Sequence, residues 1–422
     1  MIGLVWTPCA GPILAAVLVQ VIRQENDVSG FLIIAAFAIG AGVPMLVIAL
    51  TGRKLMSKLG FFTQHAEQVR KAFGIIILLA VAYIASGANP QSDAPAENIA
   101  ETSGTAGGLQ AALTNPYDAP EFTGIDTWLN SDPLTMKSLR GKVVLIDFWT
   151  YSCINCIRTL PYITKWDEKY RDNGLVIVGV HAPEFEFEKN QANVEAAIKK
   201  YNIKYPVAMD NNLDTWTAFK NRYWPAHYLI NQEGKVVYTH FGEGQYARTE
   251  NNIRTLLGIT EKTESTPEQT PYRKGQTPET YLGYARAQSY AGSPALIRNQ
   301  DSDYQSPASL PLNNWALGGG WNVAAEKITS TKAGATLKLH FKARRVFLVM
   351  GTANGEPVEV TLTLNGHPVS GTLLGDDAKN GTITVDSHRL YSLIDQPEFK
   401  SAVLEITADG PGLEAYAFTF GD

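Results

Sequence analysis

Apolar residues dominate the first 88 positions of the chain, and charged residues are concentrated in the positions that follow. Residues 30–50 carry no charged side chain over about the 20 residues that a membrane-spanning helix requires. Residues 72–88 are shorter and equally uncharged, and residues 2–22 form a third apolar stretch that prolines interrupt. A signal peptide is the alternative, but it has a basic start and only one such stretch. We therefore predict an all-α, multi-pass membrane segment over residues 1–88, with about three transmembrane helices.

The loops on either side of the last apolar stretch differ in charge. Residues 51–71 include five basic side chains, whereas no Lys or Arg occurs between Gly74 and Met136. Because short cytoplasmic loops are enriched in Lys and Arg, the first loop is predicted to lie inside the cell and the second outside. We expect the residues after about 88 to lie on the extracytoplasmic, periplasmic side of the inner (cytoplasmic) membrane, where disulfides persist.

A cysteine lies inside the first apolar stretch, in the sequence Trp6-Thr-Pro-Cys9-Ala-Gly-Pro12. The prolines break a continuous helix, and broken helices within a membrane occur where they are buried in protein or line a cavity. Cys9 is therefore a candidate membrane thiol that a partner thiol can reach, or a small apolar packing residue. On the run GLVWTPCAGPIL, the segment resembles the second half of the CcdA-type membrane electron carriers. The resemblance implies electron transfer through the membrane, with the first half and its cysteine supplied by a longer chain or another subunit.

Two polar stretches divide the rest of the chain. Residues 89–118 are rich in Ala, Pro, Ser, Gly, Thr and Asn, and residues 260–278 are similar, which is typical of flexible tethers. Strands and helices alternate in the domain between them, residues 119–259, which predicts an α/β fold with an antiparallel edge. The expected elements are strands at Lys142–Trp149 and Leu175–Val180, helices after Cys156, near 190–201 and near 213–222, and a hairpin of His227–Asn231 and Lys235–His240.

The predicted strand that ends at Trp149 is followed by Thr-Tyr-Ser-Cys153-Ile-Asn-Cys156 and then by apolar residues at three- and four-residue spacing. The two cysteines therefore lie where a strand passes into a helix N-terminus, whose unpaired N–H groups and positive dipole end favour a thiolate. We predict that Cys153 is the nucleophile and forms a mixed disulfide with the substrate. Cys156, one turn further along the helix, then resolves it.

Two other roles for a CxxC pair are disfavoured. Zinc normally takes four ligands, and the sequence has no second CxxC and no spaced pair of histidines to complete a site. A purely structural disulfide across a four-residue loop gains only about 2 kcal/mol. We therefore expect no metal, and no cofactor other than the redox-active disulfide Cys153–Cys156.

Asp147 stands inside the predicted buried strand, six residues before Cys153, where an ionised carboxylate is costly. We interpret it as the proton acceptor for Cys156, through its side chain or a water; the alternative is a carboxylate that only accepts hydrogen bonds. Pro225 directly precedes the strand that begins at Ala226. A cis bond there would bring the backbone against the dithiol and leave an edge for an extended substrate, whereas a trans proline would only start the strand.

The run Ile146-Asp-Phe-Trp149, the CxxC and Pro225 about 70 residues later resemble thioredoxin, in particular the membrane-anchored TlpA type used in cytochrome c maturation. Residues 175–188, LVIVGVHAPEFEFE, resemble the segment that these proteins insert after the second strand. The resemblance implies two residues that tune the dithiol, Trp149 and Glu184, with a solvated carboxylate as the alternative for Glu184. Ile-Asn replaces Gly-Pro between the cysteines, so the direction of electron flow stays open.

Residues 279–422 change to short runs of alternating apolar and polar residues, separated by Gly and Asn turns. Asn365-Gly366 is the strongest hairpin signal among them. The pattern predicts an all-β antiparallel sandwich. Trp315 and Trp321 are candidates for stacking on a sugar or gripping a protein, or for the core. The expected strands are Ala335–Phe341, Arg345–Met350, Val358–Leu364, Thr382–Val385, Ala402–Ile406 and Leu413–Phe420.

A membrane segment, a thioredoxin-like domain and a β-domain, in that order, resemble the DipZ proteins, in which a carbohydrate-binding-module-like sandwich follows the thioredoxin domain. The resemblance covers most of the chain. It implies a glycan or protein ligand for the C-terminal domain, to which no residue is assigned.

The chain has 422 residues and a net charge of −5, without a Lys- or Arg-rich block, which argues against a nucleic-acid partner. Its three cysteines are too few for a small secreted fold that several disulfides hold together. The leading hypothesis is a membrane-anchored thiol-disulfide oxidoreductase that reduces extracytoplasmic protein disulfides, with apocytochrome c as a candidate, fed by a CcdA-like electron route. The alternatives are a thiol oxidant of the same fold, or an envelope protein that binds a glycan or partner and uses the thioredoxin fold as scaffold.

Overall fold

The computed structural model describes residues 108–260 and 273–421. The chain divides into two compact units, residues 1–100 and 101–422, and every described residue belongs to the second. The predicted transmembrane helices and Cys9 lie outside the described residues. Within the described ranges, no helix is both long enough and apolar enough to cross a membrane.

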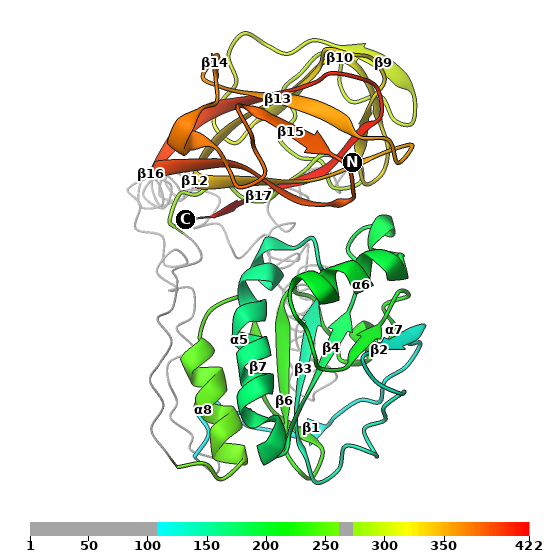
Figure 1. Ribbon diagram of the computed structural model, residues 1–422, viewed down its shortest axis with the longest axis vertical. Helices are drawn as coiled ribbons and strands as arrows, with labels where there is room; N and C mark the ends of the chain where they lie inside the picture. Colours follow the sequence, from blue (N-terminus) through cyan, green and yellow to red (C-terminus); the bar gives the residue numbers. More distant parts are fainter. Residues whose placement is uncertain (1–107, 261–272, 422) are drawn as a thin grey trace, which may run out of the picture. The chain divides into compact units, whose positions relative to one another are not determined.

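The first described domain is built on a seven-stranded sheet in the order β1-β7-β6-β3-β4-β5-β2 (Figure 1). Strands β3, β4 and β5 are parallel, whereas β6, β7, β1 and β2 pair antiparallel with their neighbours. The predicted α/β fold with an antiparallel edge is confirmed. Its elements are β1 (Tyr117–Asp118), β2 (Thr127–Leu129), β3 (Val143–Trp149), α5 (Ile154–Tyr170), β4 (Leu175–His181), α6 (Gln191–Lys200), β5 (Val207–Met209), α7 (Asp214–Ala218), β6 (Ala226–Ile230), β7 (Lys235–Phe241) and α8 (Tyr246–Leu256).

Strand β3 is buried along its whole length, as its apolar and β-branched composition predicts. Alternate residues of a strand face opposite sides of the sheet. Val143, Leu145 and Trp149 join the core that includes α5, α6 and α8. Val144, Ile146 and Phe148 join the core that includes Trp216 of α7. Asp147 is two residues from both Leu145 and Trp149, so its side chain points to the same face of the sheet as theirs, the face that α5 covers.

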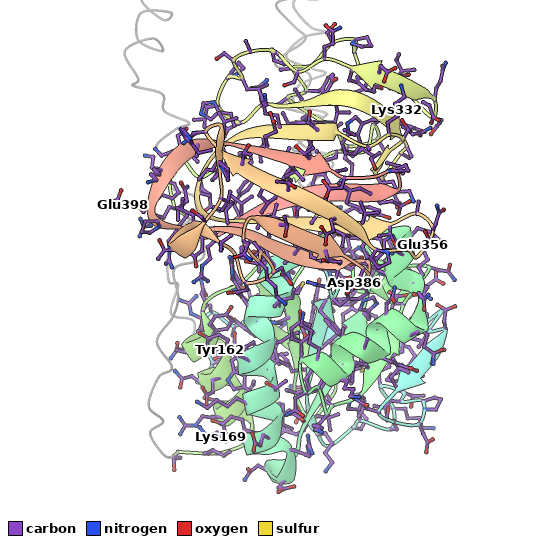
Figure 2. All side chains as sticks on the ribbon, turned by 45° about the horizontal axis from the view of Figure 1, so that its top comes forward. Tyr162, Lys169, Lys332, Glu356, Asp386 and Glu398 are labelled. Atoms are coloured by element: carbon purple, nitrogen blue, oxygen red, sulfur yellow. The ribbon has the colours of Figure 1, made fainter. Side chains whose placement is uncertain are left out.

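Helix α5 carries the dithiol at its N-terminus and packs against α8. The rings of Tyr162 on α5 and Tyr246 on α8 stack with centroids 3.6 Å apart. Lys169 Nζ lies 3.1 Å from Glu250 Oε1, also on α8. Figure 2 labels Tyr162 and Lys169 along α5. These contacts hold the helix against its neighbour and so help to fix the place of its first turn.

The second described domain consists of ten antiparallel strands joined in one connected sheet around a single core. Strand β12 pairs with β10 through its first half and with β17 through its second half, and β16 pairs with it along most of its length. The predicted antiparallel all-β architecture is confirmed. The strands are β8 (Thr280–Tyr281), β9 (Asp301–Tyr304), β10 (Trp315–Val323), β11 (Ile328–Ser330), β12 (Ala335–Thr352), β13 (Val358–Leu364), β14 (His367–Pro368), β15 (Thr382–Val385), β16 (Arg389–Ala408) and β17 (Leu413–Gly421).

Two local predictions for this domain can be compared with the structure. Asn365 and Gly366 join β13 to β14 with φ angles of 52° and 80°, the positive values that a tight two-residue hairpin turn requires. Trp315 and Trp321 are both 0% exposed and belong to the core. Of the roles considered for these tryptophans, the structure shows the core, and neither ring presents a face to a ligand.

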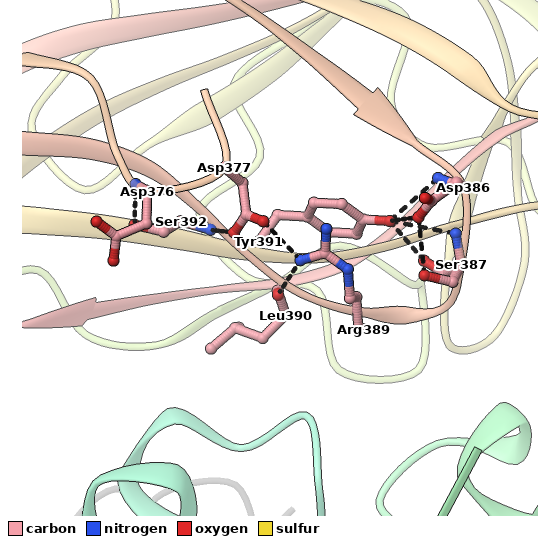
Figure 3. A network of polar contacts seen from close by, with 8 residues as sticks. All are labelled: Asp376, Asp377, Asp386, Ser387, Arg389, Leu390, Tyr391 and Ser392. Carbon is pink, nitrogen blue, oxygen red and sulfur yellow. Dashed lines mark hydrogen bonds and ion pairs between the residues drawn. The ribbon is translucent and has the colours of Figure 1, made fainter. Parts of the chain in front are cut away.

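A polar network holds two loops against the start of β16 (Figure 3). The carboxylate of Asp377 accepts from Arg389 Nη1 and from the backbone N–H of Ser392, each at 2.8 Å. The hydroxyl of Tyr391, whose ring is 0% exposed, donates to the carbonyl of Ser387 at 2.8 Å. These bonds satisfy backbone groups of the loops that regular strand pairing leaves free.

Candidate redox site

The dithiol lies at the N-terminus of α5. Cys153 is the N-cap residue, and its Sγ accepts a hydrogen bond from the backbone N–H of Cys156 at 3.4 Å. Both cysteines are free thiols; Cys153 is partly exposed and Cys156 is 1% exposed. A helix N-terminus stabilises negative charge on a nearby sulfur. The exposed thiol is therefore the one placed to act as a nucleophile.

Cys156 has the opposite environment. Burial raises the pKa of its thiol well above the ordinary value, and the hydrogen bond and charge interaction with Cys153 raise it further. A neutral thiol is a poor nucleophile, because only the thiolate attacks a disulfide. Cys156 therefore needs a nearby group that takes its proton.

Asp147 is the carboxylate beneath the dithiol. It is 1% exposed and lies on the same face of the sheet as Leu145 and Trp149, which share a core with Cys156, and its charge contributes to the raised pKa of Cys156. Asp147 Oδ1 lies 3.3 Å from Nε2 of His227, which is 0% exposed. No hydrogen bond to the Asp147 carboxylate is present among the described residues.

Pro225 lies immediately before β6, as predicted, and the Trp224–Pro225 peptide bond is cis. The carbonyl of Pro225 accepts a hydrogen bond from the backbone N–H of Gly242 at 2.8 Å. The indole Nε1 of Trp224 donates to the carbonyl of Ala182 at 2.9 Å. These bonds anchor the Trp224–Pro225 segment on both sides.

The two residues expected to tune the dithiol lie in different surroundings. Trp149, at the end of β3, is 0% exposed and meets the ring of His181 edge-on, with centroids 5.2 Å apart. The carboxylate of Glu184 accepts hydrogen bonds from the hydroxyl of Tyr281 and from Arg286 Nη1, each at 2.8 Å. Its partners therefore come from the C-terminal domain.

A second glutamate of the same segment lies beside the dithiol. Glu188 is 0% exposed, and its Oε1 accepts from the hydroxyl of Ser152 at 2.5 Å. Its Oε2 accepts from the backbone N–H groups of Glu184 and Phe185 at 2.6 and 3.1 Å. Burial raises the pKa of Glu188 to about 7, against the lowering effect of the Ser152 hydrogen bond. Glu188 thus ties the residue before Cys153 to the segment after β4.

His227 and Glu188 are the site residues that the sequence reasoning missed. A histidine two residues after Pro225, within the largely apolar run AHYLI, is a polar residue in a buried strand and could have been noticed. Nothing in the run EFEFE distinguishes Glu188 from its neighbours, because its burial depends on the 3-10 helix at Glu186–Lys189.

Metal ligation is the other chemistry that cysteines and histidines can supply. In the part of the chain that the structure describes, no group of three or more His, Cys, Asp or Glu side chains is placed to hold a metal ion. The expectation of no metal and no cofactor beyond the dithiol stays a prediction.

Known proteins match the chain in three consecutive parts. Family models described as the cytochrome C biogenesis protein transmembrane domain, redoxin, and the thioredoxin like C-terminal domain match residues 1–87, 115–257 and 277–421. Thiol-disulfide oxidoreductase ResA of Bacillus cereus is 30% identical over 139 residues, which are 33% of this chain and 76% of ResA. The chain belongs to the thiol-disulfide oxidoreductase family.

One relative of this oxidoreductase matches over the whole chain. Protein DipZ of Mycobacterium tuberculosis, like that of Mycobacterium bovis, is 35% identical over 458 residues, which cover 100% of this chain and 63% of DipZ. The chain thus spans less than two thirds of that relative. The predicted DipZ-type order of segments is confirmed. A solved structure of a thioredoxin-like protein in the oxidized form is 29% identical, with a TM-score of 0.33, and covers 35% of this oxidoreductase and 100% of its own chain.

Proposed function

We propose that the chain is a membrane-anchored thiol-disulfide oxidoreductase whose extracytoplasmic domain reduces protein disulfides. The observation that carries this proposal is the unequal environment of two free thiols, one partly exposed at a helix N-terminus and one buried. In the first step the thiolate of Cys153 attacks a substrate disulfide, forms a mixed disulfide and expels one substrate thiolate. In the second step the thiolate of Cys156 attacks Cys153 Sγ, forms the Cys153–Cys156 disulfide and releases the second substrate thiolate, so two electrons pass to the substrate.

The other candidate residues serve these two steps. Asp147 takes the proton of Cys156, and Pro225 offers backbone beside the dithiol to an extended substrate. Trp149 packs under the loop that carries the dithiol, and Glu184 joins this region to the C-terminal domain. The disulfide itself is the redox group, and no other cofactor takes part.

The electrons come from the membrane. The match of residues 1–87 to a transmembrane domain described for cytochrome c biogenesis supports a CcdA-like route with Cys9 as its thiol in this chain, and apocytochrome c as a candidate substrate. The membrane part is multi-pass, with the residues after about 88 on the periplasmic side. The C-terminal region folds as a sandwich, and its ligand is a glycan or a protein.

The equilibrium reduction potential of the dithiol tests the direction of electron flow. The full chain carrying Cys9→Ser, so that only one dithiol titrates, is equilibrated in detergent with dithiol redox buffers. A potential near that of thioredoxin, about −270 mV, is expected for a reductant, whereas a value near −120 mV would favour a thiol oxidant instead.

A trapping experiment tests the exchange itself. A Cys156→Ser variant is expected to accumulate mixed disulfides between Cys153 and its substrates, because the resolving thiol is gone. A matched Cys153→Ser variant should trap nothing. If neither variant traps a protein and the parent reduces no disulfide, the chain is a binding protein that uses the thioredoxin fold as a scaffold.

A further inference from the structure

Three polar side chains form a row across three neighbouring strands of the sheet, on the face that α5 covers. Asp147 on β3 is the cross-strand partner of His227 on β6, and His227 is the cross-strand partner of His240 on β7. Directly opposed residues of antiparallel strands place their side chains on the same face. Leu229, two residues after His227, shares a core with Cys156, so this is the face that α5 covers.

The first two members of this row are deeply buried. Asp147 is 1% exposed and His227 is 0% exposed, and Asp147 Oδ1 lies 3.3 Å from His227 Nε2. Neither side chain makes a hydrogen bond to any other described residue. A buried carboxylate without a compensating partner is strongly destabilising, and the imidazole of His227 is the group placed to compensate Asp147.

The third member leads toward the surface. The ring centroids of His227 and His240 lie 6.0 Å apart, and His240 is partly exposed near the end of β7. Burial, and after it the neighbouring His227, lower the pKa of His240 to about 4, while the backbone of Glu243 and Gly244 opposes this. A neutral imidazole can accept a proton on one nitrogen and release one from the other.

We propose that His227 is a proton-relay residue for the dithiol. It takes, by way of Asp147, the proton that Cys156 gives up on resolving the mixed disulfide, and His240 passes that proton on to solvent. The inference rests on the thiol-disulfide exchange function proposed above and adds a buried path for the proton of Cys156.

The proton and electron balance is simple. Cys156–SH gives its proton to the Asp147 carboxylate, which gives one to neutral His227, and the Cys156 thiolate displaces the substrate sulfur from Cys153. Cys153 and Cys156 are oxidised to a disulfide, and the substrate leaves as a thiolate that solvent protonates. The proton left on His227 returns to solvent through His240.

Asp147 is 1% exposed, so a proton that it takes from Cys156 can reach solvent before the dithiol is reduced again only by way of a neighbouring side chain. The titratable groups that face the pair are Cys156 on α5, Tyr205 before β5 and His240 on β7. Burial raises the pKa of Tyr205 well above its ordinary value, and Asp147 raises it further, so this hydroxyl stays neutral and takes no proton.

The two chemical steps can be timed separately with 5,5′-dithiobis(2-nitrobenzoate). The full chain carrying Cys9→Ser is reduced and studied in detergent. It releases one coloured 2-nitro-5-thiobenzoate ion, the thiobenzoate product, when Cys153 attacks the reagent, and a second when Cys156 resolves the mixed disulfide. In His227→Asn and His227→Leu, we expect the second release at pH 7 to slow by about tenfold or more, within the range of general acid–base effects. The rate should recover as pH rises toward 9, because the fraction of Cys156 present as thiolate then increases without a base to take its proton. The first release should stay within about twofold of the parent.

The His227→Asn variant distinguishes two roles of His227, proton transfer and hydrogen bonding. An asparagine side chain can donate a hydrogen bond to Asp147 but cannot take up a proton and pass it on. Full activity in His227→Asn with loss in His227→Leu would overturn the proposal, as would an unchanged second release in both. Equal slowing of both releases would also overturn it, because it would indicate general distortion. His340→Asn is the matched control, since His340 makes two hydrogen bonds in the C-terminal domain and should change neither release.

A double-variant cycle tests whether His227 acts through Asp147. If it does, Asp147→Asn combined with His227→Asn should slow the second release no more than Asp147→Asn alone. Additive losses would contradict the relay. If the parent itself gives no second thiobenzoate, the exchange function fails, and this outcome is distinct from a failure of the His227 assignment.

Discussion

At the scale of single residues, Glu188 holds the segment after β4 to the loop that carries the dithiol. Burial raises the pKa of this carboxyl from 4.5 to about 7. The folded protein therefore keeps a proton on Glu188 over a pH range in which the unfolded chain has lost it. The contribution of Glu188 to the unfolding free energy is fully present below pH 4.5, and it is lost as pH rises from there through about 7.

Glu188→Gln should remove this pH dependence, because glutamine resembles the protonated carboxyl at every pH. Relative to the variant, the parent should lose up to roughly 3 kcal/mol of unfolding free energy between pH 5 and pH 8. Thermal unfolding midpoints across this range measure the difference. Glu186→Gln is the control, since that side chain is 76% exposed. A constant gap between the parent and Glu188→Gln at all pH values would contradict the assignment.

The residues of the site differ in how far the sequence reveals them. Cys153 and Cys156 could be identified because their chemistry depends on a local setting, a strand followed by a helix, that hydrophobic patterning predicts. The partner of Asp147 could not, because His227 lies 80 residues further on and meets it only through the antiparallel pairing of β3 with β6. The local pattern can mark His227 as a polar residue in a buried strand, but it does not show which residue of another strand His227 meets.

At the scale of elements, the longest strands show where pattern reasoning fails. Two strands were expected at Ala335–Phe341 and Arg345–Met350, but β12 runs unbroken over Ala335–Thr352. Its pairing with β16 shifts register between Ala343 and Arg345, a bulge that interrupts the alternation. The charged run at this bulge resembles a turn in the sequence. The prediction of two strands was therefore wrong, whereas Val358–Leu364 was predicted with the bounds that β13 has.

The polar network at the start of β16 gives a prediction at this scale. The hydroxyl of Tyr391 also accepts hydrogen bonds from the backbone N–H groups of Asp386 and Ser387, each at 3.2 Å. Tyr391→Phe leaves these donors without that acceptor, at a cost of about 1–3 kcal/mol. We expect amide hydrogen exchange in residues 386–392 to accelerate by about tenfold or more, since tenfold corresponds to about 1.4 kcal/mol.

The control removes a tyrosine hydroxyl that lies outside this polar network. Tyr284 accepts one exposed hydrogen bond from Asn299 Nδ2, so Tyr284→Phe should leave exchange in residues 386–392 unchanged. Unchanged exchange in Tyr391→Phe as well would show that the network does not stabilise this turn.

At the scale of the whole molecule, the order of three parts could be predicted because each has its own periodicity: uncharged runs, alternating strands and helices, and short alternating strands. Contacts between parts could not. Glu184 was expected near the dithiol, but its partners Tyr281 and Arg286 lie 97 and 102 residues away in the sequence. Such contacts depend on how folded surfaces meet, which no local pattern encodes.

The combination of a membrane segment with a dithiol domain makes a prediction about electron supply. If Cys9 passes electrons toward Cys153 and Cys156, a Cys9→Ser variant in cells of the source organism should accumulate the oxidised dithiol. The purified variant should still exchange with 5,5′-dithiobis(2-nitrobenzoate), because the two thiols at α5 are unaltered. Mass-shifting alkylation of the thiols in intact cells measures the oxidised fraction.

Ala16→Ser places the same polar group in the same apolar stretch and keeps Cys9, so it separates loss of the thiol from disturbance of the membrane segment. Its dithiol should stay as reduced as that of the parent. If Cys9→Ser and Ala16→Ser both leave the dithiol reduced, electrons reach the redox domain without Cys9. A donor outside this segment would then have to reduce the Cys153–Cys156 disulfide directly, and Cys9 would be the apolar packing residue that its size also permits.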